Sequence, residues 1–297
     1  MSVERDARAA RIAFVVGIAM MVVAALAFGL SNNLAKLSYG AGVTALTVIT
    51  GRAWLGMIAL LVLSIARGYR LTLPRVAFWL FVVTALANGT QNPAILYAIE
   101  FIPLSLSVLI IYLFPIIVAL ASALLGHDRI TRPVAIAALV GFAGVALVLE
   151  LGTIALDWRG MALAFLAACA LATNVMGAAR MNRHMPALVV PLWLYAASVP
   201  FYTAALAVQG GPRFPTAGFD WLIFIGAITA LPVALITFYG ALPRAGAARA
   251  SLVMNFEPLF TILLAALLLG ETLGPMQIAG GLLIIGSIFY VSIYGRR

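Results

Sequence analysis

Residues 113–128, LFPIIVALASALLGHD, are echoed by residues 256–271, FEPLFTILLAALLLGE, and this pair of segments decides how the chain is organised. A shift of 143 residues aligns Pro115 with Pro258, Asp128 with Glu271 and Gly17 with Gly160. An internal match at a fixed offset indicates that the chain contains the same structural unit twice. We therefore divide it into a first repeat, residues 1–152, and a second repeat, residues 153–297.

Apolar residues dominate both repeats, with 65% hydrophobic residues and only 9% charged residues in the chain. Runs of about 20 apolar residues are long enough to cross a hydrocarbon core about 30 Å thick. We predict an all-α integral membrane protein with ten transmembrane helices. The expected spans are 12–35, 43–66, 75–99, 102–125, 133–151, 158–178, 186–209, 219–241, 246–269 and 274–294.

Basic residues indicate how these helices are oriented. Fourteen of them fall in alternate segments that include both termini, whereas the opposite segments contain only Lys36, Arg159 and Arg213. The positive-inside rule then places both termini in the cytoplasm. Because each repeat holds five spans, an odd number, the second repeat is expected to be inverted relative to the first, an arrangement found in secondary transporters.

Several other function classes fit poorly. The net charge of +9 comes from a thin fringe at the ends of the spans and not from a basic groove, so we expect no nucleic-acid partner. The sequence contains no cluster of carboxylates, histidines or Ser-His-Asp residues typical of a catalytic centre, so we expect no enzyme, no cofactor and no metal. Cys169 is the single cysteine, which excludes an internal disulfide.

The segments EFIPLSLSVLIIYLFPIIVALASALLGHDRITRP and LPRAGAARASLVMNFEPLFTILLAALLLGETLGPMQIAGGLLIIGSIF resemble the two halves of an EamA-type member of the drug/metabolite transporter superfamily. The resemblance covers nearly the whole chain. It implies ten helices in an inverted five-plus-five repeat and the export of small metabolites. Within the superfamily the chain is most similar to bacterial exporters of aromatic and other amino acids.

A polar stretch interrupts the third predicted span, at residues 88–94, NGTQNPA. Asn88, Gln91 and Asn92 have the spacing i, i+3, i+4 and share one helix face, which Thr84 extends toward the cytoplasm. Unpaired amides facing lipid would cost several kcal/mol, so this face points inward. It either lines a substrate cavity, the interpretation we favour, or bonds neighbouring helices. Pro93 removes a backbone donor there and is a candidate hinge or kink.

Other residues deep in the predicted spans are further candidates. Pro115 and Pro258 lie near the middle of corresponding spans and are candidate kinks, and Tyr112 lies just before Pro115. Glu257 is the single acidic residue expected near a membrane midplane, where a charge costs on the order of 3 kcal/mol. Arg52 is its candidate ion-pair partner, and a coupling or substrate role for this pair is equally open.

Polar residues also gather near the outer end of the first predicted span, where Ser31, Asn32, Asn33 and Lys36 follow one another. They either cap the helix or line the outer mouth of a cavity, and the sequence slightly favours the cap.

We therefore predict a secondary transporter that exports aromatic, hydrophobic and similar zwitterionic amino acids by alternating access, from a central cavity between the repeats. The predicted substrate-binding residues are Thr84, Asn88, Gln91, Asn92, Tyr112 and Glu257. Arginine outnumbers lysine 17 to 1 in this alanine-rich chain, a bias that favours a bacterial inner membrane. The alternatives are an exporter of other small metabolites or drugs, or a channel. Proton coupling and oligomeric state are left open, a monomer included.

Overall fold

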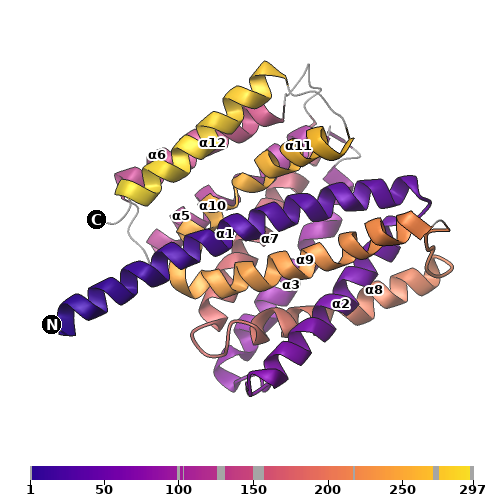
Figure 1. The fold of residues 1–297 in the computed structure, drawn as a ribbon, viewed down its shortest axis with the longest axis horizontal. Helices are drawn as coiled ribbons and strands as arrows, with labels where there is room; N and C mark the ends of the chain where they lie inside the picture. Colours follow the sequence, from indigo (N-terminus) through magenta and orange to yellow (C-terminus); the bar gives the residue numbers. More distant parts are fainter. Residues whose placement is uncertain are drawn as a thin grey trace.

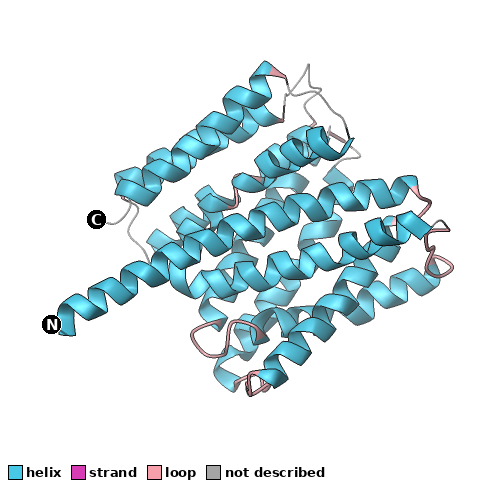
Figure 2. Ribbon diagram, viewed as in Figure 1, coloured by secondary structure: helices cyan, strands magenta, loops and turns pink. Residues whose placement is uncertain are grey.

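The computed structural model describes residues 2–98, 101–102, 104–125, 131–149, 157–216, 218–269 and 274–294. Across these ranges the secondary structure is helical, with short connecting turns and no strand (Figure 2). The helices of the first repeat are α1 (Ser2–Gly40), α2 (Ala45–Ala66), α3 (Arg75–Ala98), α4 (Leu104–Ile111), α5 (Phe114–Leu124) and α6 (Arg132–Val148). Those of the second are α7 (Trp158–Met181), α8 (Val189–Val208), α9 (Gly218–Ala245), α10 (Ala247–Val253), α11 (Phe256–Leu269) and α12 (Pro275–Tyr294).

Each predicted span contains one of these helices, except that two spans are each divided into a pair. Pro115 lies in the first turn of α5, directly after the break that separates it from α4. A proline has no N–H to bond the carbonyl four residues earlier, so the helix is interrupted just before it. Pro258 has the same position relative to the break between α10 and α11, where the Glu257 N–H instead bonds the Met254 carbonyl oxygen at 2.9 Å.

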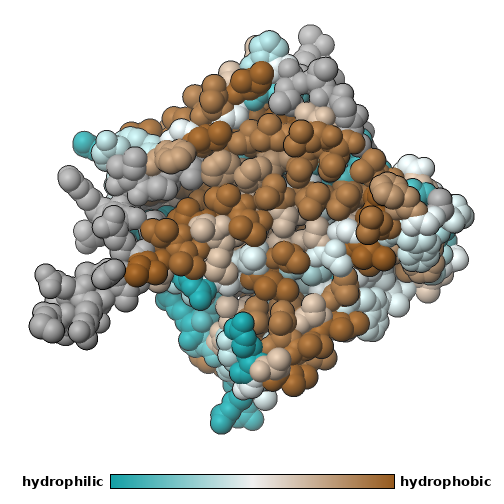
Figure 3. All heavy atoms as spheres, in the orientation of Figure 1, coloured by the Kyte–Doolittle hydropathy of each residue, from teal (hydrophilic) through white to brown (hydrophobic). Residues whose placement is uncertain are grey.

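Length and composition make several of the helices suitable for crossing a membrane. Within the described residues, seven segments are long and apolar enough to span a bilayer, and the segments Arg132–Val148 and Pro275–Ser287 are shorter apolar helices. Large apolar side chains cover the outside, as Trp79 is 74% exposed and Phe201 is 67% exposed. The face in Figure 3 is mostly hydrophobic, with hydrophilic residues toward its margins. Lipid contact explains an apolar surface that water would not support.

Helices from one repeat pack against helices from the other. The extensive contacts are between α1 and α9, α3 and α7, α2 and α8, and α6 and α12, and Figure 1 shows the last pair lying side by side. Between the repeats, α1 corresponds to α7 and α3 corresponds to α9. The contact of α1 with α9 is therefore equivalent to the contact of α7 with α3. The two repeats are therefore interleaved, and the space at their centre is bounded by both.

Small residues allow these close contacts. A Cβ added to Gly280 on α12 would lie 2.5 Å from the backbone oxygen of Gly144 on α6. A Cβ added to Gly56 on α2 would lie 2.6 Å from the ring of Tyr195 on α8. Membrane helices pack through small residues because van der Waals contact, and not the hydrophobic effect, holds them together in lipid.

Candidate functional site

A central cavity of about 320 Å³ lies between α1, α2, α3, α8 and α9. Its polar wall is formed by Arg52, Asn88 and Ser198 together with four tyrosines, Tyr39, Tyr195, Tyr202 and Tyr239. Apolar residues complete it: Ile49, Ala53, Pro191, Leu194, Leu231 and Leu235. A cavity with apolar walls and a few fixed polar groups is the usual form of a small-molecule site.

The cavity is bounded by equivalent positions of the two repeats. Arg52 on α2 and Tyr195 on α8 are 143 residues apart, as are Asn88 on α3 and Leu231 on α9, and all four line the cavity. In inverted-repeat transporters the substrate lies at this interface between repeats. The two repeats nevertheless contribute different chemistry. The arginine at position 52 corresponds to a tyrosine in the second repeat, and the asparagine at position 88 corresponds to a leucine.

Asn88 is held in the cavity wall by a hydrogen-bond network across four helices. Asn174 on α7 donates from Nδ2 to Asn88 Oδ1 at 2.9 Å, and Tyr239 on α9 donates from its hydroxyl to Asn174 Oδ1 at 3.2 Å. Asn88 Nδ2 in turn donates to Ser198 Oγ on α8 at 3.3 Å. This network fixes which way the Asn88 amide points, so its orientation at the cavity is set before any solute arrives.

Arg52 is anchored just as firmly, by two backbone carbonyl groups. Its Nε donates to the Ala227 oxygen at 3.0 Å, and one terminal nitrogen donates to the Ser31 oxygen at 2.6 Å. Ser31 Oγ also donates to the Ala227 oxygen at 3.2 Å, which joins α1, α2 and α9 at this point. Carbonyl oxygens hold the guanidinium without neutralising its charge, so a cation remains at the cavity wall.

Tyr195 in this wall carries a further donor, its hydroxyl. It is buried and has no hydrogen-bond partner in the structure. A buried hydroxyl without a partner loses about 1–3 kcal/mol. The Tyr195 side chain lines the cavity, whereas its hydroxyl packs against Gly56 on α2, so a local rearrangement would present this donor to a solute beside Arg52.

Glu257 occupies a separate polar cluster where α1 meets α11. Asn32 donates from Nδ2 to Glu257 Oε1 at 3.2 Å, and the Tyr112 hydroxyl also hydrogen-bonds this carboxyl. Arg52 therefore does not form the ion pair with Glu257 that the sequence suggested, because each side chain has a different set of partners. A substrate or coupling role for Tyr112 and Glu257 stays a prediction, now at a place distinct from the wall of the central cavity.

The outer polar residues of α1 bond neighbouring helices and do not cap their own helix. The helix continues to Gly40, beyond Ser31 and Asn33, so the favoured capping interpretation is wrong. Asn33 Nδ2 lies 2.9 Å from both the Gly29 oxygen on its own helix and the Thr261 oxygen on α11. The interhelical partners of Asn32 and Asn33 lie on α11, more than 200 residues away in the sequence. The sequence of the first span alone therefore could not identify them.

The remaining members of the predicted polar face lie elsewhere on α3. Thr84 is fully buried, bonds the Leu80 oxygen at 2.7 Å and packs against Gly177 on α7. Gln91 is half-buried and lies outside the wall of the central cavity. The side chains of Asn92 and Pro93 lie outside the described residues. The backbone is helical throughout α3, so any hinge at Pro93 does not divide this helix.

Sequence reasoning missed several residues of the cavity. The four tyrosines come from α1, α8 and α9, and although Tyr195 and Tyr202 share one face of α8, no spacing in the sequence connects them with Tyr39 or Tyr239. Asn174 gave one usable signal, because it aligns with Ser31 across the repeat and is a polar residue within an apolar span. Among the described residues, no three His, Cys, Asp or Glu side chains lie close enough together to hold a metal ion.

The model of the EamA-like transporter family matches the chain twice, over residues 15–150 and residues 158–293. The two matches begin 143 residues apart (158 − 15), the offset found in the sequence. No curated protein matches the chain.

A solved crystal structure described only as that of a protein has a similar fold, with a TM-score of 0.76 over 96% of this chain and 99% of the other. The identity between the two is 19%, so the match shows a shared fold.

Proposed function

Because this chain belongs to the EamA-like transporter family, whose members are membrane transporters and not enzymes, we propose that it exports amino acids with aromatic or other hydrophobic side chains. The observation that carries the proposal is the Arg52 guanidinium at the wall of the central cavity, with Tyr195 beside it in the same wall and the Tyr195 hydroxyl without a partner. A carboxylate can accept from both donors. Charge-assisted hydrogen bonds of this kind are about twice as strong as neutral ones.

The rest of the cavity suits the other parts of such a solute. Tyrosine rings attract an ammonium group through their faces. Asn88 presents a fixed amide, and apolar residues such as Leu194, Leu231 and Leu235 accept a hydrophobic side chain. A volume of about 320 Å³ is at the small end of the range for ligand pockets, which favours a single metabolite over a large drug.

Alternating access is the mechanism that we propose. The cavity lies between two interleaved repeats, and the broken pairs α4/α5 and α10/α11 provide a discontinuity in each repeat where the backbone can bend. In the proposed arrangement the chain crosses a bacterial inner membrane ten times with both termini in the cytoplasm, and the second repeat is inverted. The family match to each repeat and the exchange of helix contacts between them support this arrangement.

Cysteine labelling tests the orientation. With Cys169 replaced by alanine, a cysteine at Gln209, after the end of α8, should react with an impermeant thiol reagent in intact cells. A cysteine at Arg70, between α2 and α3, should react only after the cells are opened. Both positions are exposed in the structure, so access to reagent depends on the side of the membrane. The opposite pattern would reverse the proposed orientation.

Transport in proteoliposomes tests the function. Wild-type protein should exchange labelled phenylalanine, and phenylethylamine, which lacks the carboxylate, should compete poorly. Tyr195→Phe removes a hydroxyl that makes no bond within the protein, so it should leave the melting temperature unchanged and raise the KM. Tyr97→Phe is the matched control, because Tyr97 is 58% exposed and lies away from the cavity.

The alternative is export of another small metabolite or a drug, and the same assay separates the two. Equal competition by phenylethylamine and phenylalanine would remove the carboxylate from the recognition chemistry. Transport of a cationic drug without any amino-acid flux would replace the proposed substrate class. Flux that shows no saturation with concentration would favour a channel.

A further inference from the structure

A second cavity, of about 240 Å³, lies at the end of α7 where α9 gives way to α10. Its wall includes Ser122 on α5, Arg180 and Arg183 at the end of α7, and Gly246 and Ala247 where α10 begins. In the proposed orientation this end of the bundle faces the cytoplasm. The cavity therefore lies on the side from which an exporter takes up its solute.

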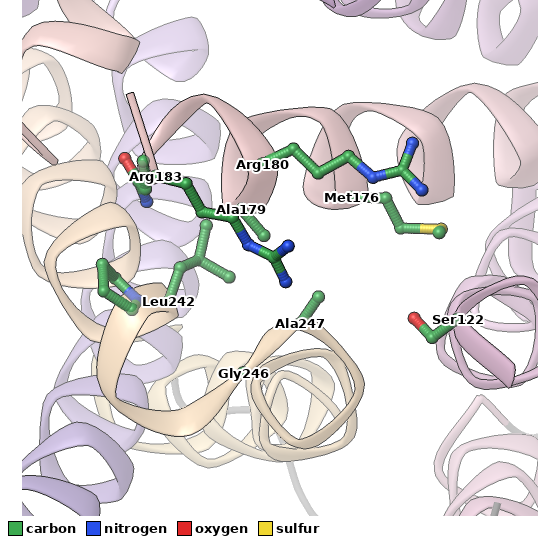
Figure 4. Close-up of a pocket in the computed structure, with 10 residues that line it drawn as sticks. Ser122, Met176, Ala179, Arg180, Arg183, Leu242, Gly246 and Ala247 are labelled. Atoms are coloured by element: carbon green, nitrogen blue, oxygen red, sulfur yellow. The ribbon is translucent and has the colours of Figure 1, made fainter. Parts of the chain in front are cut away.

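Two arginines give this cavity a positive wall. Figure 4 shows the Arg183 guanidinium in the space between the end of α7 and Ala247, while the Arg180 side chain extends along α7 toward the side on which Ser122 lies. Within the described chain, no hydrogen bond or ion pair engages the Arg183 guanidinium, which is exposed. The charge is therefore available to an anion that enters from the aqueous side.

Asn182 contributes the complementary group. Its Nδ2 donates to the Tyr239 backbone oxygen at 3.4 Å, whereas its Oδ1 is buried and has no partner. A buried amide oxygen without a donor is costly. Asn182 also lines the cavity, so a rotation of its amide would present an acceptor beside the arginines, and the two together would satisfy both ends of a zwitterion.

Tyr239 connects this cavity with the central one. Its backbone oxygen accepts from Asn182, while its hydroxyl donates to Asn174 and its side chain lines the central cavity. One residue therefore forms part of the partition between the two spaces. A solute in the second cavity would therefore contact Asn182, which is bonded to a residue in the wall of the cavity that contains Arg52.

We propose that the second cavity is an entry-side binding site for the solute, in which Arg183 and Arg180 bind its carboxylate and Asn182 Oδ1 accepts from its ammonium group. This inference rests on the proposed export of amino acids and on the cytoplasmic location of the end of α7. It assigns recognition of the same carboxylate to two successive places, one on each side of Tyr239.

Kinetics measured separately from the two faces of the membrane test the proposal. Arg183→Gln should raise the KM for phenylalanine about tenfold when the solute is supplied at the cytoplasmic face, in inside-out vesicles, and leave the KM at the outer face unchanged. Arg70→Gln is the matched control, since it removes one cytoplasmic charge away from the cavity. An equal KM change at both faces, or an equal effect of the control, would overturn the inference.

A binding measurement that needs no transport separates this inference from the proposed function. With Cys169 replaced, a cysteine at Ala247 reports on the second cavity, because Ala247 lines it and is partly accessible. Benzoate, a simple carboxylate, should slow maleimide labelling of this cysteine. The protection should disappear with Arg183→Gln and persist with Arg70→Gln.

Each outcome has a distinct meaning. If benzoate does not slow maleimide labelling in a protein that transports phenylalanine, the proposed entry site is refuted and the proposed function is unaffected. Protection by benzoate in a protein that transports no amino acid supports the oxyanion site and refutes the proposed function. Protection that requires phosphatidylglycerol in the vesicles, and that benzoate does not reproduce, assigns the cavity to a lipid phosphate and overturns the entry role.

Discussion

Replacement of Asn88 by leucine should reduce transport far more than it reduces stability. The leucine is similar in size to asparagine but cannot bond Asn174 or Ser198, so two interhelical hydrogen bonds are lost. Hydrogen bonds between membrane helices contribute about 0.6 kcal/mol each, so the expected loss of stability is about 1.2 kcal/mol. Against a typical folding free energy of about 5–15 kcal/mol, this leaves the protein folded.

The cost to transport is larger because Asn88 faces the cavity. A hydrogen bond between the amide and a charged group of the solute contributes about 1.5–3 kcal/mol, which corresponds to about a 10- to 150-fold loss of affinity. Initial rates at low concentrations of labelled phenylalanine, compared with the amount of monodisperse protein recovered in detergent, measure the two effects separately.

Asn33→Leu is the matched control for this experiment. Asn33 is buried, whereas Asn88 is half-buried, and Asn33 also makes two hydrogen bonds, at 2.9 Å each, of which the one to Thr261 is interhelical; it lies outside the wall of the central cavity. It should lose similar stability and retain most of its flux at equal protein amounts. If the two variants lose flux and stability in the same proportion, Asn88 serves only to join helices and the assignment of the cavity is refuted.

Three further perturbations follow from the geometry. Arg52→Met should lower both the melting temperature and the flux. Arg52→Lys should recover part of the flux but not the melting temperature, because an ammonium group cannot donate to the Ala227 and Ser31 oxygens as the guanidinium does. Thermal unfolding and proteoliposome flux measure the two effects. Glu257→Gln keeps an acceptor for Asn32, so yield should hold while flux loses its response to an imposed pH gradient, and a persisting response would exclude Glu257 as the coupling group. Gly280→Ala, with a Cβ 2.5 Å from a backbone oxygen of α6, should cost about 1–3 kcal/mol in unfolding, whereas Gly286→Ala on the same helix has open space and should not.

The sequence predicted the helical membrane architecture and the family because both depend on local signals. Apolar length identifies the seven segments that are long enough to span a bilayer among the described residues, and the offset between Pro115 and Pro258 identifies the repeat without any knowledge of packing. The same prolines located the interruptions, since the missing N–H acts within one helical turn. The extension of α1 to Gly40 was less predictable, because the polar residues at 31–33 look like a helix end until their partners on α9 and α11 are known.

The site was less accessible to sequence reasoning. A helical wheel groups Thr84 with Asn88, yet it does not say which neighbouring helix each residue meets. Thr84 packs against α7 at Gly177, where the absence of a Cβ leaves room for the threonine side chain. The pairing of Arg52 with Glu257 failed for a related reason. Carbonyl oxygens are invisible in a sequence, and two of them, at Ser31 and Ala227, hold the guanidinium that appeared to need an acidic partner.

The unequal contributions of the two repeats to the central cavity have a thermodynamic consequence. In the alternating-access mechanism that we propose, two identical inverted halves would give inward-open and outward-open forms that are related by a two-fold rotation and have equal free energies. Here Asn88 corresponds to Leu231 and Arg52 corresponds to Tyr195, so the two proposed forms would expose chemically different walls to water. Each such difference favours one form, and a bias of about 1.4 kcal/mol is enough for a tenfold excess of that form at rest. In this mechanism, the preferred form of the empty protein would therefore be set at the cavity positions where the two repeats carry different residues.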